Sequence, residues 1–465
     1  MKNIKKYILG FALMTTAFTF LSCEDKLEII PNNALVPETA FRTVDDLQNG
    51  LNAAYSRYGN NTITLNSIFT DNTKVGFDNG GQQLSLHRLV MDPNTGIAST
   101  IWINRYTMIN ETTRVIDAAA SGSIDIDGRQ SELNNILGQC YALRAFAHFE
   151  LFQYYTPDYL DPNGLSVPAV DINVTTQTLP RNTVSEVLTL INDDLTVAQG
   201  LLDQSATNNK YVTTDFLKAL KARIGLFTGD YTMALNNAND LINSYDLADR
   251  NQYVSMYNDN DNTEVIFKAA RTIADARPGN IWHFFGGGPF MEMSNSLFNE
   301  LDPADVRYNV LLNVFESDPA NNVHKINKYP GTAVEFLADV KVFRVSEMYL
   351  IKAEVEARNS DFIASRNTLK ELRDARYGSN TALESYANLS DALDVILKER
   401  RLELAYEGHR YLDLKRLNRN LERIDLDCGN LDNACQIVNT DPRFTLPIPA
   451  AEINANPNMV QNPGY

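Results

Sequence analysis

Cysteine, histidine and tryptophan are scarce in this sequence, whose 465 residues include four, five and two of them, respectively. Four cysteines are too few for a disulfide-dense scaffold. No histidine lies near Cys428 and Cys435, which argues against a zinc site at that pair. The sequence also lacks a nucleophile elbow, a phosphate loop and a paired-histidine zinc helix. We therefore predict no catalytic residue, no metal and no cofactor.

Positive charge is also in short supply. The chain has 41 Lys and Arg against 58 Asp and Glu, which gives a formal net charge of −17. Nucleic-acid phosphates demand a basic face, so this balance argues against a nucleic-acid partner. It argues weakly against strongly anionic polysaccharides as well. Hydrophobic residues make up 44% of the chain, which is enough for a large buried core.

One short apolar run stands at the start of the chain, and no later run approaches the ~20 residues of a membrane span. Three lysines within the first six residues precede the run Tyr7–Phe20, and Cys23 follows closely. This pattern predicts a lipoprotein signal peptide over residues 1–22, with lipid attached to Cys23 and a short tether over 23–36. The acyl chains would anchor the exported protein to a membrane. The alternative is an ordinary signal peptide with an incidental cysteine.

Helical periodicity dominates the rest of the sequence and predicts a mainly α protein with few short strands. Residues 59–97 are rich in Asn, Gly, Gln and Asp and are predicted to form an irregular region. Residues 246–342 are also irregular, apart from a short strand at Val265–Phe267. The expected helices cover approximately residues 43–55, 100–120, 131–155, 184–202, 213–228, 232–244, 348–358, 362–376 and 387–418.

Two segments resemble tetratricopeptide helix pairs. In the first, Ala219–Arg223 is followed by Gly229–Tyr231 and then by further small residues, a pattern typical of two closely crossing helices joined by a tight turn. In the second, Ala353 precedes Asp361-Phe362 with the same spacing. The copies are not tandem, so we predict an interrupted helix-pair array. We divide it into an N-terminal helical region, 37–245, and a C-terminal region, 246–465.

Four longer motifs resemble those of the SusD/RagB family. They stand in the expected order and, together with the start of the chain, cover nearly all of it. The motifs are Tyr141–Phe149, Arg344–Glu354, Glu399–Arg416 and Leu446–Ile453.

The resemblance implies a surface lipoprotein of Bacteroidetes. Such a protein captures a nutrient, usually a glycan, and acts as a lid over a SusC-like TonB-dependent transporter. Acidic residues after the lipidated cysteine signal surface export in many members, and Glu24 and Asp25 fit this. Some relatives serve peptide uptake, and two tryptophans are few for a glycan-binding protein. A peptide-capturing protein therefore stays open as an alternative.

Aromatic residues on irregular loops are the best candidates for ligand binding, because sugar rings present apolar C–H faces to aromatic side chains. The clearest cluster runs from Trp282 to Phe285 and precedes three glycines and a proline. We expect Trp282, Phe284 and Phe285 to contact ligand and His283 to donate a hydrogen bond. The spacing of Trp102 predicts a core residue instead.

A second, weaker group of candidate ligand residues lies in the polar region before the predicted helix at 100–120. It consists of Asp71, Asn72 and Phe77.

Several polar features favour structural roles. In the signature Glu399–Arg416, helical spacing would pair Arg400 with Glu403 and Glu407 with Arg410, and we interpret these charges as packing elements. The cluster Asp259, Asp261 and Glu264 offers oxygen ligands for calcium, but a solvated acidic turn is favoured.

The cysteines divide between two expected states. In an exported protein, Cys428 and Cys435 could close a local disulfide. Cys140 stands in an apolar helical stretch and is expected to be a buried thiol.

Two other classes of protein compete with nutrient capture. A glycoside hydrolase needs only two carboxylates placed by the fold, so the lack of motifs does not exclude it. A repeat scaffold that binds only proteins would leave the aromatic and Gly-rich insertions unexplained.

Overall fold

The computed structural model describes residues 41–174, 177–284, 286–428 and 435–465. The predicted signal peptide, the lipidation site Cys23 and the tether lie outside the described residues. Thr43–Tyr465 is one compact unit, and the fold below is that of this unit. It contains both predicted regions, whose boundary at 245/246 stays a prediction.

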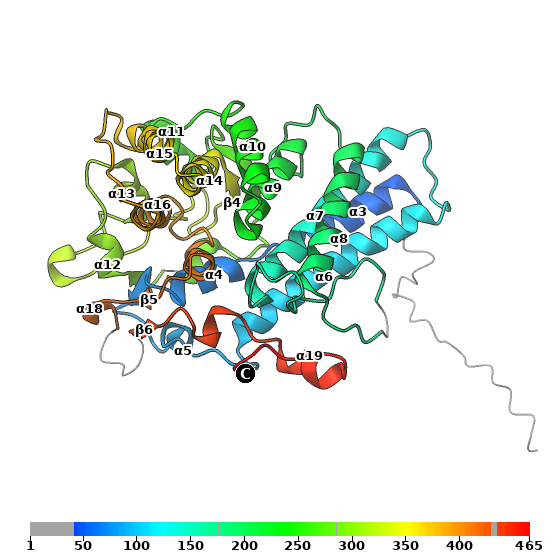
Figure 1. Cartoon of the computed structure of the whole chain (residues 1–465), viewed down its shortest axis with the longest axis horizontal. Coiled ribbons are helices and arrows are strands. Elements are labelled where there is room, and N and C mark those ends of the chain that lie inside the picture. Colours follow the sequence, from blue (N-terminus) through cyan, green and yellow to red (C-terminus); the bar gives the residue numbers. More distant parts are fainter. Residues whose placement is uncertain (1–40, 175–176, 285, 429–434) are drawn as a thin grey trace, which may run out of the picture. The chain divides into compact units, whose positions relative to one another are not determined.

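Four long helices pack side by side in the first half of the unit (Figure 1). A capping box at Thr43 begins the first of them and another at Thr183 begins the last, which explains why the sequence predicts both starts closely. Nearly all side chains in the second half of α7 are buried, as its wide apolar stripe predicts. These helices are α3 (Val44–Ser56), α6 (Gly96–Ala120), α7 (Gln130–Tyr155) and α8 (Val184–Leu201).

The predicted helix pairs are confirmed. They are α9 (Thr214–Thr228) with α10 (Tyr231–Ile242), and α14 (Val345–Arg358) with α15 (Phe362–Tyr377). Helix α10 packs against α14, so the two pairs stack although a long irregular segment separates them in sequence (Figure 1). A Cβ atom on Gly225 would lie only 2.7 Å from the Ala234 backbone nitrogen, so the close crossing of α9 and α10 requires glycine there.

The strands are short and form two-stranded antiparallel sheets. Strand β1 (Thr73–Val75) pairs with β3 (Met291–Met293), β2 (Val265–Ala269) with β4 (Val340–Arg344), and β5 (Leu421–Glu422) with β6 (Gln436–Ile437). The predicted strand at 265–267 is therefore confirmed. The remaining helices are α4 (Asn61–Ile68), α5 (Leu84–His87), α11 (Arg250–Tyr257), α12 (Asn295–Phe298), α13 (Val306–Leu311), α16 (Leu389–Glu403), α17 (Arg410–Arg416), α18 (Asp425–Cys428) and α19 (Ala450–Ala455), with 3₁₀ turns at Pro278–Ile281, Pro319–Asn321 and Pro442–Phe444.

Helix α4 corrects the prediction that residues 59–97 are irregular throughout. Its polar side chains suggest a loop, but they are buried and hydrogen-bonded. The Asn66 amide donates to the Tyr154 hydroxyl and to the Thr62 carbonyl, both at 2.8 Å, and its oxygen accepts from the Tyr411 backbone at 2.9 Å. Asn66 therefore joins α4 to α7 and α17, which the local composition does not reveal.

The predicted last helix, at 387–418, is wrong as a single helix. It is broken between α16 and α17 by Tyr406 and Gly408, which have φ angles of 64° and 93°. Glycine adopts this left-handed region readily, so Gly408 serves a turn here.

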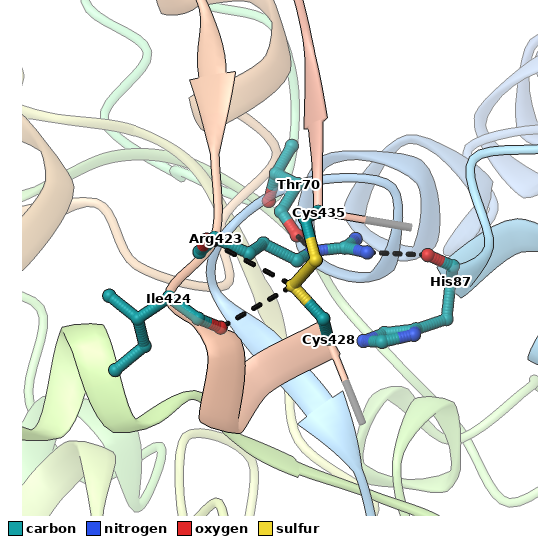
Figure 2. Close-up of a disulfide and its surroundings, with 6 residues drawn as sticks. All are labelled: Thr70, His87, Arg423, Ile424, Cys428 and Cys435. Carbon is teal, nitrogen blue, oxygen red and sulfur yellow. Dashed lines mark hydrogen bonds between the residues drawn. A yellow bond between two sulfur atoms is a disulfide. The ribbon is translucent and has the colours of Figure 1, made fainter. Parts of the chain in front are cut away.

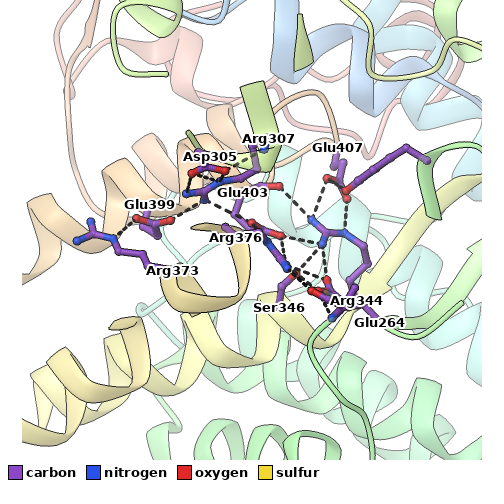
Figure 3. Close-up of polar contacts among 12 residues, drawn as sticks. Glu264, Asp305, Arg307, Arg344, Ser346, Arg373, Arg376, Glu399, Glu403 and Glu407 are labelled. Carbon is purple, nitrogen blue, oxygen red and sulfur yellow. Dashed lines mark hydrogen bonds and ion pairs between the residues drawn. The ribbon is translucent and has the colours of Figure 1, made fainter. Parts of the chain in front are cut away.

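Glu403 and Glu407 of the signature segment meet partners from distant elements and not the helical neighbours predicted for them (Figure 3). Arg344 pairs with Glu264, Glu403 and Glu407 at 2.8–2.9 Å, and Arg376 also pairs with Glu264 and Glu403. All five side chains are buried. The structural interpretation of these charges is confirmed, whereas the predicted helical pairing is wrong.

The predicted solvated acidic turn is also corrected. Glu264 is buried in the Arg344 network, and Asp259 forms an ion pair with Lys341 at 2.5 Å. In the described part of the chain, no group of three or more His, Cys, Asp or Glu side chains could hold a metal ion.

Candidate ligand-binding site

The pairing of β1 with β3 brings together the two loops that the sequence singled out separately. Thr73 lies opposite Met293 and Val75 opposite Met291. Beyond the strands, the Gly76 nitrogen donates to the Phe290 carbonyl at 3.0 Å. A Cβ atom on Gly76 would lie 2.2 Å from the Pro289 carbonyl oxygen, so only glycine allows this approach.

Two exposed phenylalanines flank the Gly-rich turn at 286–288. The side chain of Phe77 is 69% exposed and that of Phe284 is 36% exposed. Cβ atoms built on Gly288 and Gly287 would lie 2.9 Å from Phe77 Cε2 and from Phe284 Cβ, respectively, so the turn lies against both residues. Phe285, the third predicted aromatic contact, lies outside the described residues.

Hydrogen bonds hold both phenylalanines in place. Asp78 accepts from the Gly288 nitrogen at 3.1 Å, and the Phe77 nitrogen donates to Glu292 Oε1 at 3.0 Å. The ring of Phe284 packs at 5.0 Å from that of Phe290. Asp78 is itself exposed. The result is an apolar surface beside a carboxylate, a combination that suits a sugar ring and its hydroxyl groups.

A third exposed aromatic residue lies on the neighbouring loop and was missed by the sequence analysis. Phe315 is 95% exposed. Its loop borders β3, because the Met293 nitrogen donates to the His324 carbonyl at 2.9 Å and the His324 nitrogen donates to Glu292 Oε2. The available signal was an aromatic residue among Asn, Glu, Ser, Asp and Pro, the composition of a turn.

Trp282 does not belong to this exposed surface, contrary to expectation. Its side chain is 1% exposed and stacks on Tyr329, with ring centroids 6.1 Å apart. It also packs edge-on against Tyr406 at 5.0 Å, and its Nε1 donates to Ser67 Oγ at 3.3 Å. Its partners come from distant segments, so local sequence gave no sign of this burial. Trp282 therefore lies in the core, at the wall of a small internal cavity of about 160 Å³, and not on the exposed surface.

His283 is buried as well, where the sequence analysis expected a hydrogen-bond donor to ligand. Its Nε2 lies 2.8 Å from the Ile326 carbonyl, and its ring stacks on Phe336. Burial lowers the pKa of His283 to about 4. A neutral imidazole whose Nε2 is paired with backbone supports the loop and has no Nε2 donor left for a ligand.

Asp71 and Asn72, the other expected contacts, are buried under the loop. Arg410 donates to both Asp71 oxygens at 2.8 and 2.7 Å, and Arg401 donates to Asn72 Oδ1 at 3.0 Å. Burial alone would raise the pKa of Asp71, but Arg401 and Arg410 outweigh it and hold this pKa well below its usual range. Both residues therefore anchor the loop and do not face solvent.

Cys428 and Cys435 form a disulfide beside this anchor (Figure 2). Their Cα atoms are 5.2 Å apart, within the usual range. Next to them, Arg423 donates to the carbonyls of Thr70 and His87. Asp427 accepts from the Asn295 nitrogen at 2.6 Å. The disulfide-linked segment thus supports the region behind β1 and β3.

The remaining core predictions are confirmed. Cys140 is a buried free thiol, and Trp102 is a core residue whose ring centroid lies 4.7 Å from that of Tyr106. Within the described residues, no helix combines the length and the apolar character needed to cross a membrane.

Stacked helix pairs that carry exposed aromatic loops define a class of mainly helical binding protein. The family is more specific than this class: a model described as "SusD family" matches residues 232–465. A second model, described as "Starch-binding associating with outer membrane", matches residues 25–228. The chain belongs to the SusD family.

Individual relatives agree over nearly the whole chain. SusD-like protein P2 of Formosa agariphila is 24% identical over 536 residues, covering 99% of this chain and 100% of its own length. A SusD superfamily protein from Bacteroides vulgatus superposes with a TM-score of 0.79 at 25% identity, over 91% of this chain and 100% of that one. Another from Bacteroides thetaiotaomicron has a TM-score of 0.78 at 27% identity, over 90% and 100% of the two chains.

Proposed function

We propose that this protein is a surface lipoprotein that captures a nutrient oligomer, a glycan, and delivers it to a SusC-like TonB-dependent transporter. The observation that carries the proposal is the pair of exposed rings, Phe77 and Phe284, on backbone-anchored loops beside Asp78. Membership of the SusD family and the starch-binding description of the second matching model support a carbohydrate ligand. No catalytic step is part of the proposed function.

Capture would depend on apolar contact and on preorganisation. Sugar C–H faces would pack against Phe77 and Phe284, while Asp78 accepts hydrogen bonds from sugar hydroxyls. Because strand pairing and glycine contacts hold both loops, little conformational entropy is lost on binding. Phe315, on the adjoining loop, would extend the contact surface along an oligomer.

Delivery would depend on the membrane anchor. Lipid on Cys23 would keep the protein at the outer membrane, where the folded unit acts as a lid over the transporter. The signal-peptide pattern and the "associating with outer membrane" description support this location.

Native gel retardation tests the ligand class. The soluble chain begun at Glu24 is run in gels cast with neutral and acidic polysaccharides. We expect one neutral polymer to retard it. The retarding polymer is then incubated with the protein and sized by chromatography, because a hydrolase shortens its polymer and a capture protein leaves it intact. Retardation by no polysaccharide, together with saturable binding of peptides, would favour the peptide-capturing alternative.

A further inference from the structure

A cavity of about 250 Å³ shares no lining residue with these loops. Its walls come from α3, α6, α7, β2 and the segments around residues 210 and 271. Aromatic side chains form much of the wall, and two cationic side chains and one carboxylate, that of Asp275, line it as well. The residues that matter below are Tyr55, Tyr58, Lys210, Tyr211, Phe267 and Arg271.

Arg271 is the unusual member of this lining. Its side chain is partly buried, and Nη2 donates to Asn60 Oδ1 at 3.2 Å, but the buried Nε has no hydrogen-bond partner. No carboxylate of the described residues lies within ion-pair distance of it. Asp275 instead accepts from Thr272 at 2.7 and 2.8 Å, and Asp339 pairs with Lys268 at 2.9 Å.

The fully buried arginines of the described residues have their charge satisfied. Arg144 pairs with Asp194 at 2.7 Å, and Arg181, which has no acidic partner, donates to four backbone carbonyl oxygens. Arg271 has neither arrangement, and burial lowers its pKa. A buried N–H donor without a hydrogen-bond acceptor costs free energy, and an acceptor that binds beside it removes this cost. The cavity beside Arg271 offers room for that acceptor.

The aromatic wall suits a ring. Tyr211 is 42% exposed, and its ring packs edge-on against Tyr55 at 5.6 Å. The Tyr55 hydroxyl is fixed, because it donates to Gln139 Oε1 at 2.6 Å and accepts from the Val212 nitrogen at 2.7 Å. Lys210, which is exposed, adds a second positive charge at the mouth. The cavity therefore combines a fixed apolar wall with two cations and one carboxylate, Asp275, which accepts hydrogen bonds from Thr272.

We propose that this cavity is a second binding site that takes one acidic sugar residue, a hexuronate. Its carboxylate would accept hydrogen bonds from Arg271 and pair with Lys210, and its ring would pack on Tyr211 and Tyr55. The volume is below the roughly 300–1,000 Å³ of drug-sized sites, which suits a single ring and not an oligomer. A net charge of −17 on the protein disfavours binding of a long polyanion. A single acidic sugar residue would instead face only the local positive charge of Arg271 and Lys210. This site goes beyond the proposed function.

Ligand-observed saturation-transfer NMR of the soluble chain tests the site with four probes. D-glucuronate and D-galacturonate carry both features, glucose has only the ring, and acetate has only the carboxylate. We expect saturable binding of at least one uronate, about tenfold or more tighter than glucose and acetate. This affinity should weaken as salt is raised, because an ion pair at the mouth is screened.

Four variants locate the binding. Arg271→Gln should weaken uronate binding at least about tenfold, and Lys210→Gln, at an exposed position that does not threaten folding, about threefold. Arg277→Gln, on the same loop but outside the lining, and Phe77→Ala should leave it unchanged. The proposal is overturned if no uronate binds saturably, if glucose or acetate binds as tightly, or if both Arg271→Gln and Lys210→Gln retain full affinity.

Discussion

Arg410 holds Asp71 through two parallel hydrogen bonds, Nε to Oδ1 at 2.8 Å and Nη2 to Oδ2 at 2.7 Å. The two residues are 339 positions apart in the sequence. The bond fastens the start of α17 to the turn that leads into β1, and so to the loop that carries Phe77. A bidentate arginine–carboxylate pair is both strong and geometrically specific, so it fixes the direction of this loop.

Breaking that pair should destabilise the protein markedly. Arg410→Gln leaves Asp71 buried with Arg401 as its remaining cation, at 3.3 Å. We expect the free energy of unfolding to fall by about 3 kcal/mol, measured by urea denaturation. Arg57→Gln is the control, because the Arg57 side chain is 43% exposed in its pair with Glu111. This substitution should lower the free energy of unfolding by no more than about 1 kcal/mol. Equal losses in the two variants would contradict the anchoring role.

Stability should fall as pH drops below about 6.5, before most carboxylates titrate. Burial lowers the pKa of every histidine, to about 3 or 4. Between that value and 6.5 the unfolded chain binds protons that the folded chain does not, so acid favours unfolding. Each histidine contributes a slope of at most about 1.4 kcal/mol per pH unit. The histidines are His87, His148, His283, His324 and His409.

Urea denaturation at pH 7.5, 6.0 and 5.0 measures this slope. His283→Gln should make it shallower, because its amide can replace Nε2 at the Ile326 carbonyl without titrating. A flat stability profile over this range in the unmodified chain would show that the buried histidines are not kept neutral.

The sequence could predict much of the fold because its signals are local. The start of α8 is set by the Thr183–Glu186 capping box, and the turns of both helix pairs by Asp230 and Asp361 at their N-caps. The break at Gly408 is different. Helix-favouring residues surround it, and the turn is held by long-range contacts, such as the ion pairs of Glu403 and Glu407 and the hydrogen bond from the Tyr406 hydroxyl to the Asn72 carbonyl.

The candidate site could be predicted only in part, because exposure depends on distant partners. Phe77 and Phe284 were identified in separate groups, but the β1–β3 pairing that joins them spans more than 200 residues. Trp282 belongs to the same aromatic cluster of the sequence as the exposed Phe284, yet Tyr329 and Tyr406 pack against it and bury it. Tertiary packing, which local composition does not encode, therefore decides which of these aromatic side chains is exposed.

Gly76 should tolerate no side chain. The methyl group of Gly76→Ala would lie 2.2 Å from the Pro289 carbonyl oxygen, so the two loops must move apart. We expect a loss of about 1–3 kcal/mol in unfolding free energy and weaker glycan retardation. Gly200→Ala, in α8 with no atom near the added methyl, should be neutral or stabilising and keep full retardation. Normal stability of Gly76→Ala would contradict the close loop contact.

Thiol counting checks the disulfide. The soluble chain begun at Glu24 contains Cys140, Cys428 and Cys435. We expect no reactive thiol in the native protein, because Cys140 is buried, and one after denaturation without reductant. Cys428→Ala combined with Cys435→Ala should lower stability by about 2 kcal/mol, as expected for so short a loop. Three thiols in the denatured chain would contradict the bond.

The proposed capture of glycan on the exposed phenylalanines is tested most directly by one comparison. The double variant Phe77→Ala/Phe284→Ala is measured against the unmodified chain for retardation by the polysaccharide that retards the latter. Leu160→Ala is the control, since Leu160 is as exposed as Phe77, at 69%, but lies elsewhere. We expect at least about a tenfold loss of affinity in the double variant, none in the control, and unchanged stability in both. Full retardation of the double variant would place the ligand elsewhere and contradict the proposed site.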